Sequence, residues 1–420
     1  MSSSPLQPLS GRKLWIAGIG GAGMSGYALL AHAWGAEVAG WDRFETPYLR
    51  HLEGIAVEIA PEPPAPPPGW EVFVSTAFAG RVEGRPRADL LAELVEQRPA
   101  IVVAGAHGKT TTSAMIAFCL DRLGLEPAFL IGGEVPQLGG NARAGSGWLV
   151  VEGDVSDRSV VALRPEIAVL LNVDLDHHTT FVSRAELAAF FEDWLRDVPH
   201  VVRAEELQPV ELELAVPGEH NRRNAAAALA ALELAGVSRA EAAAVLVEFR
   251  GAGRRLEPKG EAGGVAVLDS YAHHPAELAA DLAALREMAG SVGGRAADAR
   301  PEDPAAFGGS RGRLLAVFQP HLYSRTLHLA HGFAQALAGA DAVCVTEIYP
   351  AREEPMPGVT GRLIVDELAR LRYGMRIGWA PALEDAAGLV AGWSRPGDTV
   401  LTLGAGDVDR AAALILEALA

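Results

Sequence analysis

Residues 101–117 read IVVAGAHGKTTTSAMIA, and this stretch predicts a strand, a glycine turn and a helix in direct succession. The β-branched run Ile101–Val103 predicts a buried strand, and the residues from Thr112 onward favour a helix. A glycine turn joins the two, so backbone N–H groups and a helix N-terminus face outward together and can bind an anion. Lys109 adds a mobile positive charge suited to outer phosphates, and the Thr110 hydroxyl is suited to Mg²⁺. The stretch therefore predicts a site for ATP and Mg²⁺.

The spacing of this motif, GxxGKT, is shorter than the common GxxxxGK[ST] pattern. A structural alternative is a glycine turn that only links a buried strand to a helix. A lysine followed by three threonines is not expected in a turn with only a structural role. The nucleotide site is therefore the favoured interpretation.

The composition describes a chain with large cores and no basic face. Its 420 residues, 49% of them hydrophobic, predict two or three domains. Only Cys119 and Cys344 occur, far apart in apolar settings, which argues against disulfides and indicates a reducing compartment. The net charge of −17 argues against a nucleic-acid partner. Since neither a signal pattern nor a charge-free run long enough for a bilayer is present, we expect a cytoplasmic protein with no membrane partner.

Residues 1–97 are expected to form a first nucleotide-binding domain. Residues 12–42 read as strand, glycine turn, helix and strand, with IGGAGMSG (19–26) at the turn and Asp42 at the end of the second strand. This order resembles a dinucleotide-binding fingerprint. It suits equally any nucleotide diphosphate laid on a helix N-terminus, including a UDP-sugar, so the turn alone leaves both ligands open.

Two further domains are expected, at residues 98–248 and 249–420. In both, apolar strands such as WLVVEGD (148–154) and VAVLDSYAHHP (265–275) alternate with helices of moderate length. That alternation predicts mainly parallel sheets. We therefore predict an α/β fold of three domains: a Rossmann-like N-terminal domain, a central ATP-binding domain around the phosphate loop, and a Rossmann-like C-terminal domain.

Five blocks occur in the order found in one enzyme family. They are GAHGKTTT (105–112), VEGDVSD (151–157), LDHH (175–178), GEHNRRNA (218–225) and YAHHPAEL (271–278). The chain resembles the Mur ligases, the ATP-dependent amino-acid-adding enzymes of peptidoglycan synthesis, over nearly its whole length. Two more blocks, VFQPHLYSRT (317–326) and EIYPAREEPMPGV (347–359), are most similar to the member that adds L-alanine.

The resemblance implies an amide ligase that converts a carboxylate into an acyl phosphate, which an amine then attacks. Both steps crowd negative charge together and need cations near the transferred phosphate. By resemblance, Mg²⁺ is held by Thr110, Glu152 and His177. The residues implied for ATP are Gly105, His107, Gly108, Lys109, Thr110, Thr111, Asn224 and Arg255.

The resemblance also implies UDP-N-acetylmuramate and L-alanine as substrates of a monomer or weak homodimer. The UDP-sugar is assigned to Gly20, Gly21, Ala22, Gly23, Met24, Ser25, Asp42, Asn141 and Arg143. The residues implied for catalysis are Lys109, Arg255, His273, His321 and Arg325. In this assignment Arg325 pairs with the alanine carboxylate, and a histidine accepts the ammonium proton.

The chain departs from the family pattern at four places. Ala106 stands where Thr or Ser is usual, and Val155 where the alanine-adding member has Glu. Ser270 replaces a second Asp that is expected to hold the ATP ribose. Residues 200–217 replace a much longer stretch of the central domain.

These departures keep other functions open. One alternative is a related Mur-type ligase with another amine substrate, such as a peptide-recycling ligase. A second is a non-catalytic nucleotide-binding paralogue. A third, an NAD-dependent oxidoreductase, rests on the first glycine turn alone and does not explain the second phosphate loop.

Overall fold

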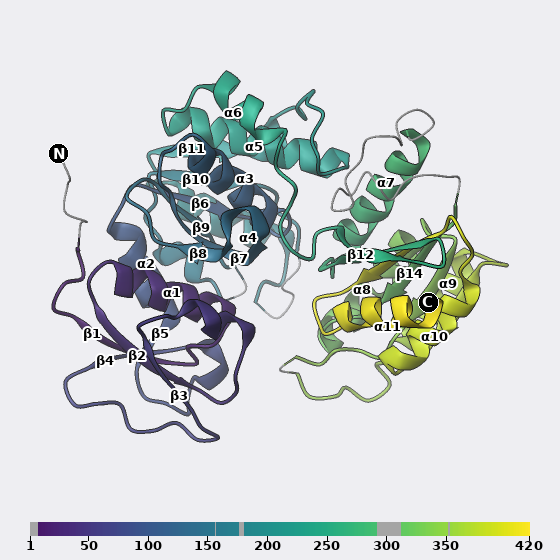
Figure 1. Ribbon diagram of the computed structural model, residues 1–420, viewed down its shortest axis with the longest axis horizontal. Coiled ribbons are helices and arrows are strands. Elements are labelled where there is room, and N and C mark those ends of the chain that lie inside the picture. Colours follow the sequence, from purple (N-terminus) through teal and green to yellow (C-terminus); the bar gives the residue numbers. More distant parts are fainter. Residues whose placement is uncertain (1–6, 156, 176–179, 292–311, 352) are drawn as a thin grey trace. The chain divides into compact units, whose positions relative to one another are not determined.

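The alternation of apolar strands with helices produces parallel sheets, as expected. The computed structural model describes residues 7–155, 157–175, 180–291, 312–351 and 353–420, and these form three sheets (Figure 1). Antiparallel pairing is confined to β7 with β8 and β12 with β13, while the other pairs are parallel. The predicted α/β class with mainly parallel sheets is confirmed.

The first sheet has the strand order β3-β2-β1-β4-β5. Its elements are β1 (Lys13–Ala17), α1 (Ala22–Ala33), β2 (Glu37–Asp42), η1 (Pro47–His51), β3 (Ala56–Ile59), β4 (Glu71–Val74), η2 (Thr76–Phe78), β5 (Arg85–Pro86) and α2 (Arg87–Glu96). A Cβ on Gly26 of α1 would lie 2.8 Å from Leu130 and 3.0 Å from Ala142, two residues of the second sheet. The small residue therefore lets α1 approach that sheet closely.

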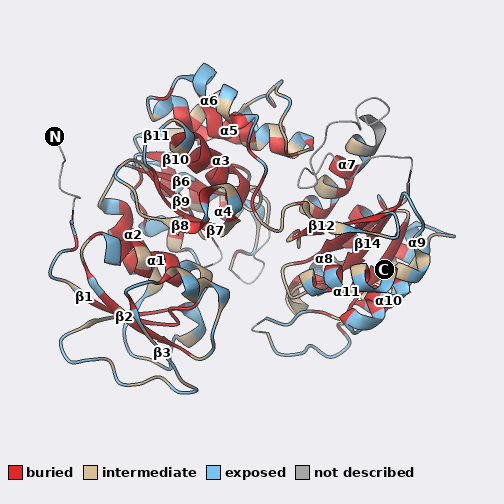
Figure 2. Ribbon diagram, viewed as in Figure 1, coloured by how far each residue is buried: buried red, intermediate tan, exposed pale blue. Residues whose placement is uncertain are grey.

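The second sheet has the order β11-β10-β6-β9-β7-β8, with the strand that precedes the phosphate loop near its middle. Its strands are β6 (Ala100–Ala104), β7 (Ala128–Val135), β8 (Gly140–Arg143), β9 (Leu149–Glu152), β10 (Ile167–Leu170) and β11 (His200–Arg203). Its helices are α3 (Lys109–Arg122), η3 (Pro136–Leu138), η4 (Ser159–Ala162), α4 (Arg184–Leu195), η5 (Ala204–Glu206), α5 (Glu219–Leu234) and α6 (Arg239–Leu246). All of β6 is buried, and so is α3 from Thr110 to Leu120 (Figure 2). The loop between them is thus anchored at both ends.

The third sheet has the order β12-β13-β17-β14-β15-β16 and helices on both faces. Its strands are β12 (Glu257–Ala262), β13 (Val265–Ser270), β14 (Leu314–Phe318), β15 (Ala342–Val345), β16 (Arg376–Trp379) and β17 (Thr399–Leu403). Its helices are α7 (Pro275–Ser291), α8 (Tyr323–Leu337), α9 (Arg362–Leu371), α10 (Leu383–Trp393) and α11 (Asp409–Leu419). Side chains of α7, α8 and α9 pack on one face, and those of α10 and α11 on the other. This is the doubly wound arrangement expected of a Rossmann-like domain.

The described chain separates into two compact units. The first runs to Asp174 and adds Ser183–Val210 and Arg223–Phe249, so it holds the first two sheets. The second holds the third sheet, from Arg250 onward, together with Glu211–Arg222. Domain boundaries at residues 97 and 248 remain predictions.

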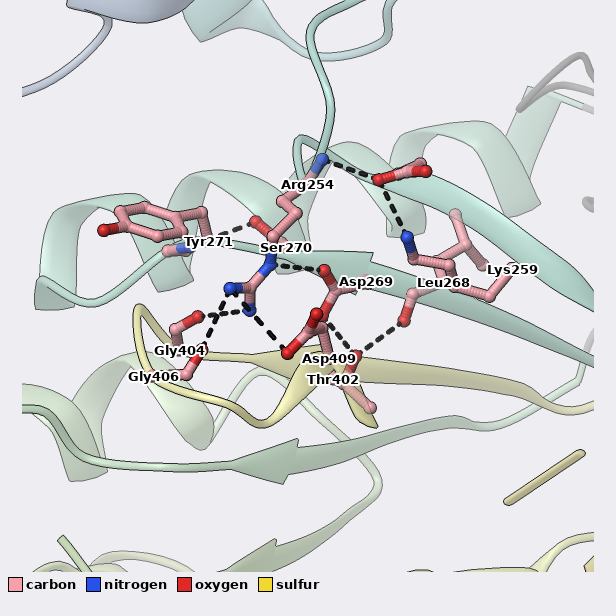
Figure 3. Close-up of polar contacts among 12 residues, drawn as sticks. Arg254, Lys259, Leu268, Asp269, Ser270, Tyr271, Thr402, Gly404, Gly406 and Asp409 are labelled. Atoms are coloured by element: carbon pink, nitrogen blue, oxygen red, sulfur yellow. Dashed lines mark hydrogen bonds and ion pairs between the residues drawn. The ribbon is translucent and has the colours of Figure 1, made fainter. Parts of the chain in front are cut away.

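A buried ion pair links β13 to β17 and to the segment that follows β17 (Figure 3). Arg254 donates from Nε to Asp269 Oδ2 at 2.8 Å, and its other nitrogens donate to the carbonyls of Gly404 and Gly406. Asp269 is fully buried and also accepts from Thr402 Oγ1 at 2.6 Å. Every polar atom that this pair buries therefore has a partner.

Next to this pair, a second carboxylate reaches the end of β13. Ser270 Oγ donates to Asp281 Oδ2 at 2.5 Å, and His220 Nε2 lies 3.9 Å from Asp281 Oδ1. Burial raises the pKa of Asp281 to about 7, against smaller lowering effects of the Ser270 hydrogen bond and the Arg255 charge. Burial, aided by Arg255, lowers the pKa of His220 to about 4. His220 is therefore neutral at pH 7, so the two side chains do not form an ion pair.

We predict that Arg254→Ala lowers the free energy of unfolding of the second unit by about 3–5 kcal/mol, since Asp269 would remain buried without its counter-charge. Equilibrium denaturation measures this change. The matched control is Arg286→Ala, which removes an exposed pair with Asp341 (2.7 Å) and should cost below about 1 kcal/mol. Similar losses in both variants would contradict the structural role of Arg254.

A second prediction concerns pH. A folded-state pKa near 7 means that the folded protein binds more protons at Asp281 than the unfolded chain between about pH 4 and 7, so this group's contribution to stability falls as pH rises through that window. Asp281→Asn removes the effect. The variant should gain stability relative to the parent between pH 5 and 8, on the order of 2–4 kcal/mol, measured from melting curves. Glu287→Gln, on the exposed side of the same helix, is the control, and an equal change in both variants would contradict the burial argument.

Candidate active site

The phosphate loop leaves β6 at Gly105 and enters α3 at Lys109. Gly105 has φ +135° and Gly108 has φ +83°, values that favour glycine. A Cβ on Gly108 would also lie 2.5 Å from Asn224 Oδ1, which places the Asn224 amide of α5 against the loop. The first N–H groups of α3 have no partner within the helix, so this end is suited to an anion.

Asn172 holds the loop in shape. Its Oδ1 accepts hydrogen bonds from Ala106 N (2.9 Å) and His107 N (3.1 Å), and its Nδ2 donates to His107 O (3.0 Å). The residue follows β10, which pairs with β6, so the sheet delivers it to the loop. The sequence analysis missed Asn172 because strand order, not a motif, brings it there.

Lys109 and Glu152 complete the loop's polar surroundings. Lys109 Nζ donates to the carbonyls of Gly105 (2.7 Å) and Ala106 (2.8 Å), so its charge lies over the loop. Thr110 Oγ1 lies 3.2 Å from Glu152 Oε2, and Gly132 N donates to Glu152 Oε1 at 2.6 Å. The hydroxyl and the carboxylate thus converge at the end of β9, where both predicted oxygen ligands are side by side.

This donor set fits Mg²⁺, which binds oxygen and commonly uses one or two carboxylates together with substrate phosphates. Among the described residues, no group of three or more His, Cys, Asp or Glu side chains is placed to hold a metal by itself. The third predicted ligand, His177, lies outside the described residues. His107 lies with Nε2 3.7 Å from Asp174 Oδ2, and Thr111 is buried in the first turn of α3.

The N-terminal glycine turn is braced by Asp42. Asp42 Oδ2 accepts from Gly20 N at 2.8 Å, and Thr46 Oγ1 donates to Gly20 O at 2.6 Å. Gly21 caps α1, and the other residues predicted for the UDP-sugar here, Ala22, Gly23, Met24 and Ser25, form its first turn. Asp42 therefore shapes the turn directly.

Of the two residues predicted from the second sheet, one reaches this turn. Asn141 Nδ2 donates to Ala22 O at 3.1 Å, so β8 meets the start of α1. Arg143 instead pairs with Asp121 of α3 at 2.5 Å. The structure brings Asn141, but not the Arg143 guanidinium, into contact with the glycine turn.

An unexpected arginine ties α2 to the acidic block after β9. Arg87 Nη2 pairs with Asp154 at 2.5 Å and Asp157 at 3.0 Å. Burial raises the pKa of the neighbouring Tyr27 to about 12, so its hydroxyl stays protonated. A lone arginine at a helix start offers no sequence signal for this role.

In the second unit, the predicted catalytic side chains gather at the carboxyl ends of β13 and β14. The ring centroids of His273 and His321 are 6.0 Å apart, and Arg325 Nη1 donates to His321 Nδ1 at 3.1 Å. His273 Nδ1 lies 3.0 Å from Tyr271 O. Because guanidinium nitrogens only donate, His321 Nδ1 accepts and its proton is on Nε2. Open α/β sheets bind ligands at this edge.

Arg255 lies beside this group and differs from its neighbour Arg254. Its guanidinium carbon is 5.2 Å from the centre of the Tyr271 ring, and its charge acts on Asp281 and His220. Arg254 is instead committed to Asp269 inside the sheet. The structure therefore separates two adjacent arginines into one with a structural role and one beside the polar cluster.

Comparisons with known proteins agree with this geometry. Residues 303–406 match the family model described as Mur ligase, glutamate ligase domain. The chain is 38% identical to the UDP-N-acetylmuramate–L-alanine ligase of Streptomyces avermitilis, covering 96% of both chains, and 38% identical to that of Thermobifida fusca, covering 99% of both.

Among solved structures, the UDP-N-acetylmuramate–alanine ligase MurC of Thermotoga maritima superposes with a TM-score of 0.74 at 26% identity, over 96% of this chain and 98% of that one. A murein peptide ligase from Psychrobacter arcticus shares the fold, with a TM-score of 0.61 at 22% identity, over 97% and 99%. No helix in the described part of the chain is long and apolar enough to cross a membrane. From its phosphate loop, its three sheets and these full-length relatives, the chain belongs to the Mur ligase family.

Proposed function

We propose that this protein joins L-alanine to the lactyl carboxylate of UDP-N-acetylmuramate and converts ATP to ADP and phosphate in the same reaction. The convergence of Thr110 and Glu152 beside the loop of Lys109 carries the proposal, because it sets two oxygen ligands suited to Mg²⁺ next to a lysine, and phosphoryl transfer needs such cations near the phosphates. The full-length relatives at 38% identity are named for this reaction.

In the first step, the γ-phosphoryl group passes from ATP to the lactyl carboxylate. Thr110 and Glu152, with His177 as the predicted third ligand, would hold Mg²⁺, which when bound neutralises charge on the phosphates. Lys109 would exchange its bonds to the Gly105 and Ala106 carbonyls for phosphate oxygens. Arg255 would stabilise the charge in transfer, and Asn224 would contact the nucleotide.

In the second step, the amine of L-alanine attacks the acyl phosphate and releases phosphate. Arg325 would bind the alanine carboxylate, since the residue is buried and its guanidinium is held by His321. His273 would accept the ammonium proton, because its Nδ1 faces the Tyr271 carbonyl and leaves Nε2 as the acceptor, whereas His321 would hold Arg325 in place. The N-terminal turn, braced by Asp42 and contacted by Asn141, would bind the UDP diphosphate.

The remaining parts of the proposal concern the protein's setting. A UDP-sugar and ATP as substrates, two buried free cysteines and the acidic composition support a cytoplasmic enzyme. We propose that it acts as a monomer or weak homodimer, without nucleic-acid or membrane partners.

We predict that UDP-N-acetylmuramate and L-alanine together stimulate phosphate release from ATP, and that Lys109→Ala reduces kcat by about 10²–10³, in the range for loss of one stabilising charge. Phosphate release measures the rate. Lys13→Ala, which removes an exposed lysine paired with Glu37, should leave the rate unchanged.

The same assay with glycine, L-serine and a peptide amine decides between the alternatives. A preference for the peptide amine would favour a peptide-recycling ligase. Absence of turnover with every amine would favour a non-catalytic nucleotide-binding paralogue and overturn the proposal.

A further prediction concerns the metal site. Glu152→Gln keeps the shape of the side chain but removes the negative charge, so the Mg²⁺ concentration needed for half-maximal rate should rise about tenfold or more. A Mg²⁺ titration of the initial rate measures this. Glu134→Gln, which removes a carboxylate of β7 that is paired with Arg50, is the control. An unchanged Mg²⁺ requirement in Glu152→Gln would remove Glu152 from the metal site.

A further inference from the structure

The end of β13 carries a serine hydroxyl and a carboxylate that arrive from different elements. Ser270 Oγ donates to Asp281 Oδ2 at 2.5 Å and accepts from Ala272 N at 3.2 Å. Ser270 is fully buried, whereas the Asp281 side chain keeps 13% of its surface exposed. Helix α7 thus places a carboxylate at the strand end, with a small part of the side chain exposed.

The Asp281 carboxylate has few hydrogen-bond donors around it among the described residues. Among the described residues, Asp281 makes a single hydrogen bond, the one from Ser270. Its other oxygen, Oδ1, is 3.9 Å from His220 Nε2, which is beyond hydrogen-bond distance. Burying a carboxyl group with one hydrogen bond is unfavourable, so its presence here points to a partner that the described residues do not supply.

The surroundings indicate which partner fits. The group lies outside the carboxyl end of a parallel strand, where open α/β sheets bind nucleotides, and acidic residues there accept hydrogen bonds from ribose hydroxyls. Arg255, which is expected at the nucleotide phosphates, is close enough for its charge to act on Asp281. Ser270 stands where the family resemblance places a ribose-binding aspartate.

We propose that Asp281 is the ribose-binding residue of this chain: its Oδ1 accepts a hydrogen bond from a ribose hydroxyl of ATP, while Ser270 holds the carboxylate in position through Oδ2. The carboxylate missing at position 270 is supplied from α7. This inference rests on the proposed function as an ATP-dependent ligase.

The test is nucleotide binding by the full-length protein, measured by calorimetry with Mg²⁺ and ADP, 2′-deoxy-ADP or 3′-deoxy-ADP. The parent should bind ADP about tenfold more tightly than one of the two deoxy analogues, as expected for one hydrogen bond to a charged acceptor. Asp281→Ala should lose that factor for ADP while leaving the affinity for the same analogue nearly unchanged. Asp281→Asn, which keeps the side-chain shape, should give an intermediate ratio.

An exchange variant separates a ligand role from a structural one. Ser270→Asp combined with Asp281→Ser returns the carboxylate to the strand and should restore discrimination between ADP and the deoxy analogue. Ser270→Asp alone places two carboxylates in contact and should weaken ADP binding. Glu287→Gln, which removes a carboxylate of the same helix paired with Arg222, should leave the ratio unchanged.

Two results overturn the inference, and they are distinguishable. Tight ADP binding with the same ratio to the deoxy analogues in the parent, Asp281→Ala and the exchange variant would limit Asp281 to a structural role and leave the proposed function intact. Absence of any ADP binding by the parent would overturn the proposed function and this inference together.

Discussion

The first unit depends on one constraint: the buried strand β6 must leave its sheet through a loop whose last residue, position 108, accepts only glycine. Gly108 combines a left-handed backbone with the Asn224 amide at 2.5 Å from where a Cβ would stand, so an added methyl group would be both strained and blocked. Because parallel strands end at the same edge, β9 and β10 bring Glu152 and Asn172 to this loop. The order of the strands in this sheet therefore brings the loop, the Glu152 carboxylate and the Asn172 amide together.

In the third sheet, the ends of the strands are fixed by a buried ion pair, Arg254 with Asp269. There β13, β14 and β17 end together, and Arg254, which Asp269 holds in place, donates to the carbonyls of Gly404 and Gly406 at that edge. A rigid edge then holds His273, His321 and Arg325 near one another. Since catalytic groups need fixed positions, the stability of the buried ion pair and the geometry of the cluster are linked.

Much of the fold could be predicted from the sequence, because buried strands appear in it as short apolar runs. The segments around β1, β6, β9 and β13 were expected, and so were the helices that follow the two glycine turns, α1 and α3. The polar edge strands β12 and β16 lack such a pattern, since Glu257–Ala262 and Arg376–Trp379 have no fully buried residue. The phosphate loop with Lys109 could be located because its residues are contiguous in the sequence.

Residues whose roles depend on strand order could not be found in this way. Asn172 and Arg87 act on groups more than sixty positions away in the chain. Arg143, whose contact with the sugar stays a prediction, pairs with Asp121 of α3, a contact that no motif in the sequence indicates. Arg254 and Arg255 are identical neighbours in the sequence, and only the positive φ of Arg254 (+55°) with its buried partner Asp269 separates their roles.

The departures from the family pattern gain a physical meaning in this context. The N–H groups of Ala106 and His107 are held by Asn172, so the loop keeps its shape without a hydroxyl at position 106, and Val155 is buried as an apolar side chain should be. At position 270, an aspartate would meet Asp281 at hydrogen-bond distance and place two carboxylates together in a buried site. Ser270 and Asp281 are therefore mutually dependent. The serine at position 270, where the family pattern has an aspartate, is explained by the aspartate at position 281 of α7.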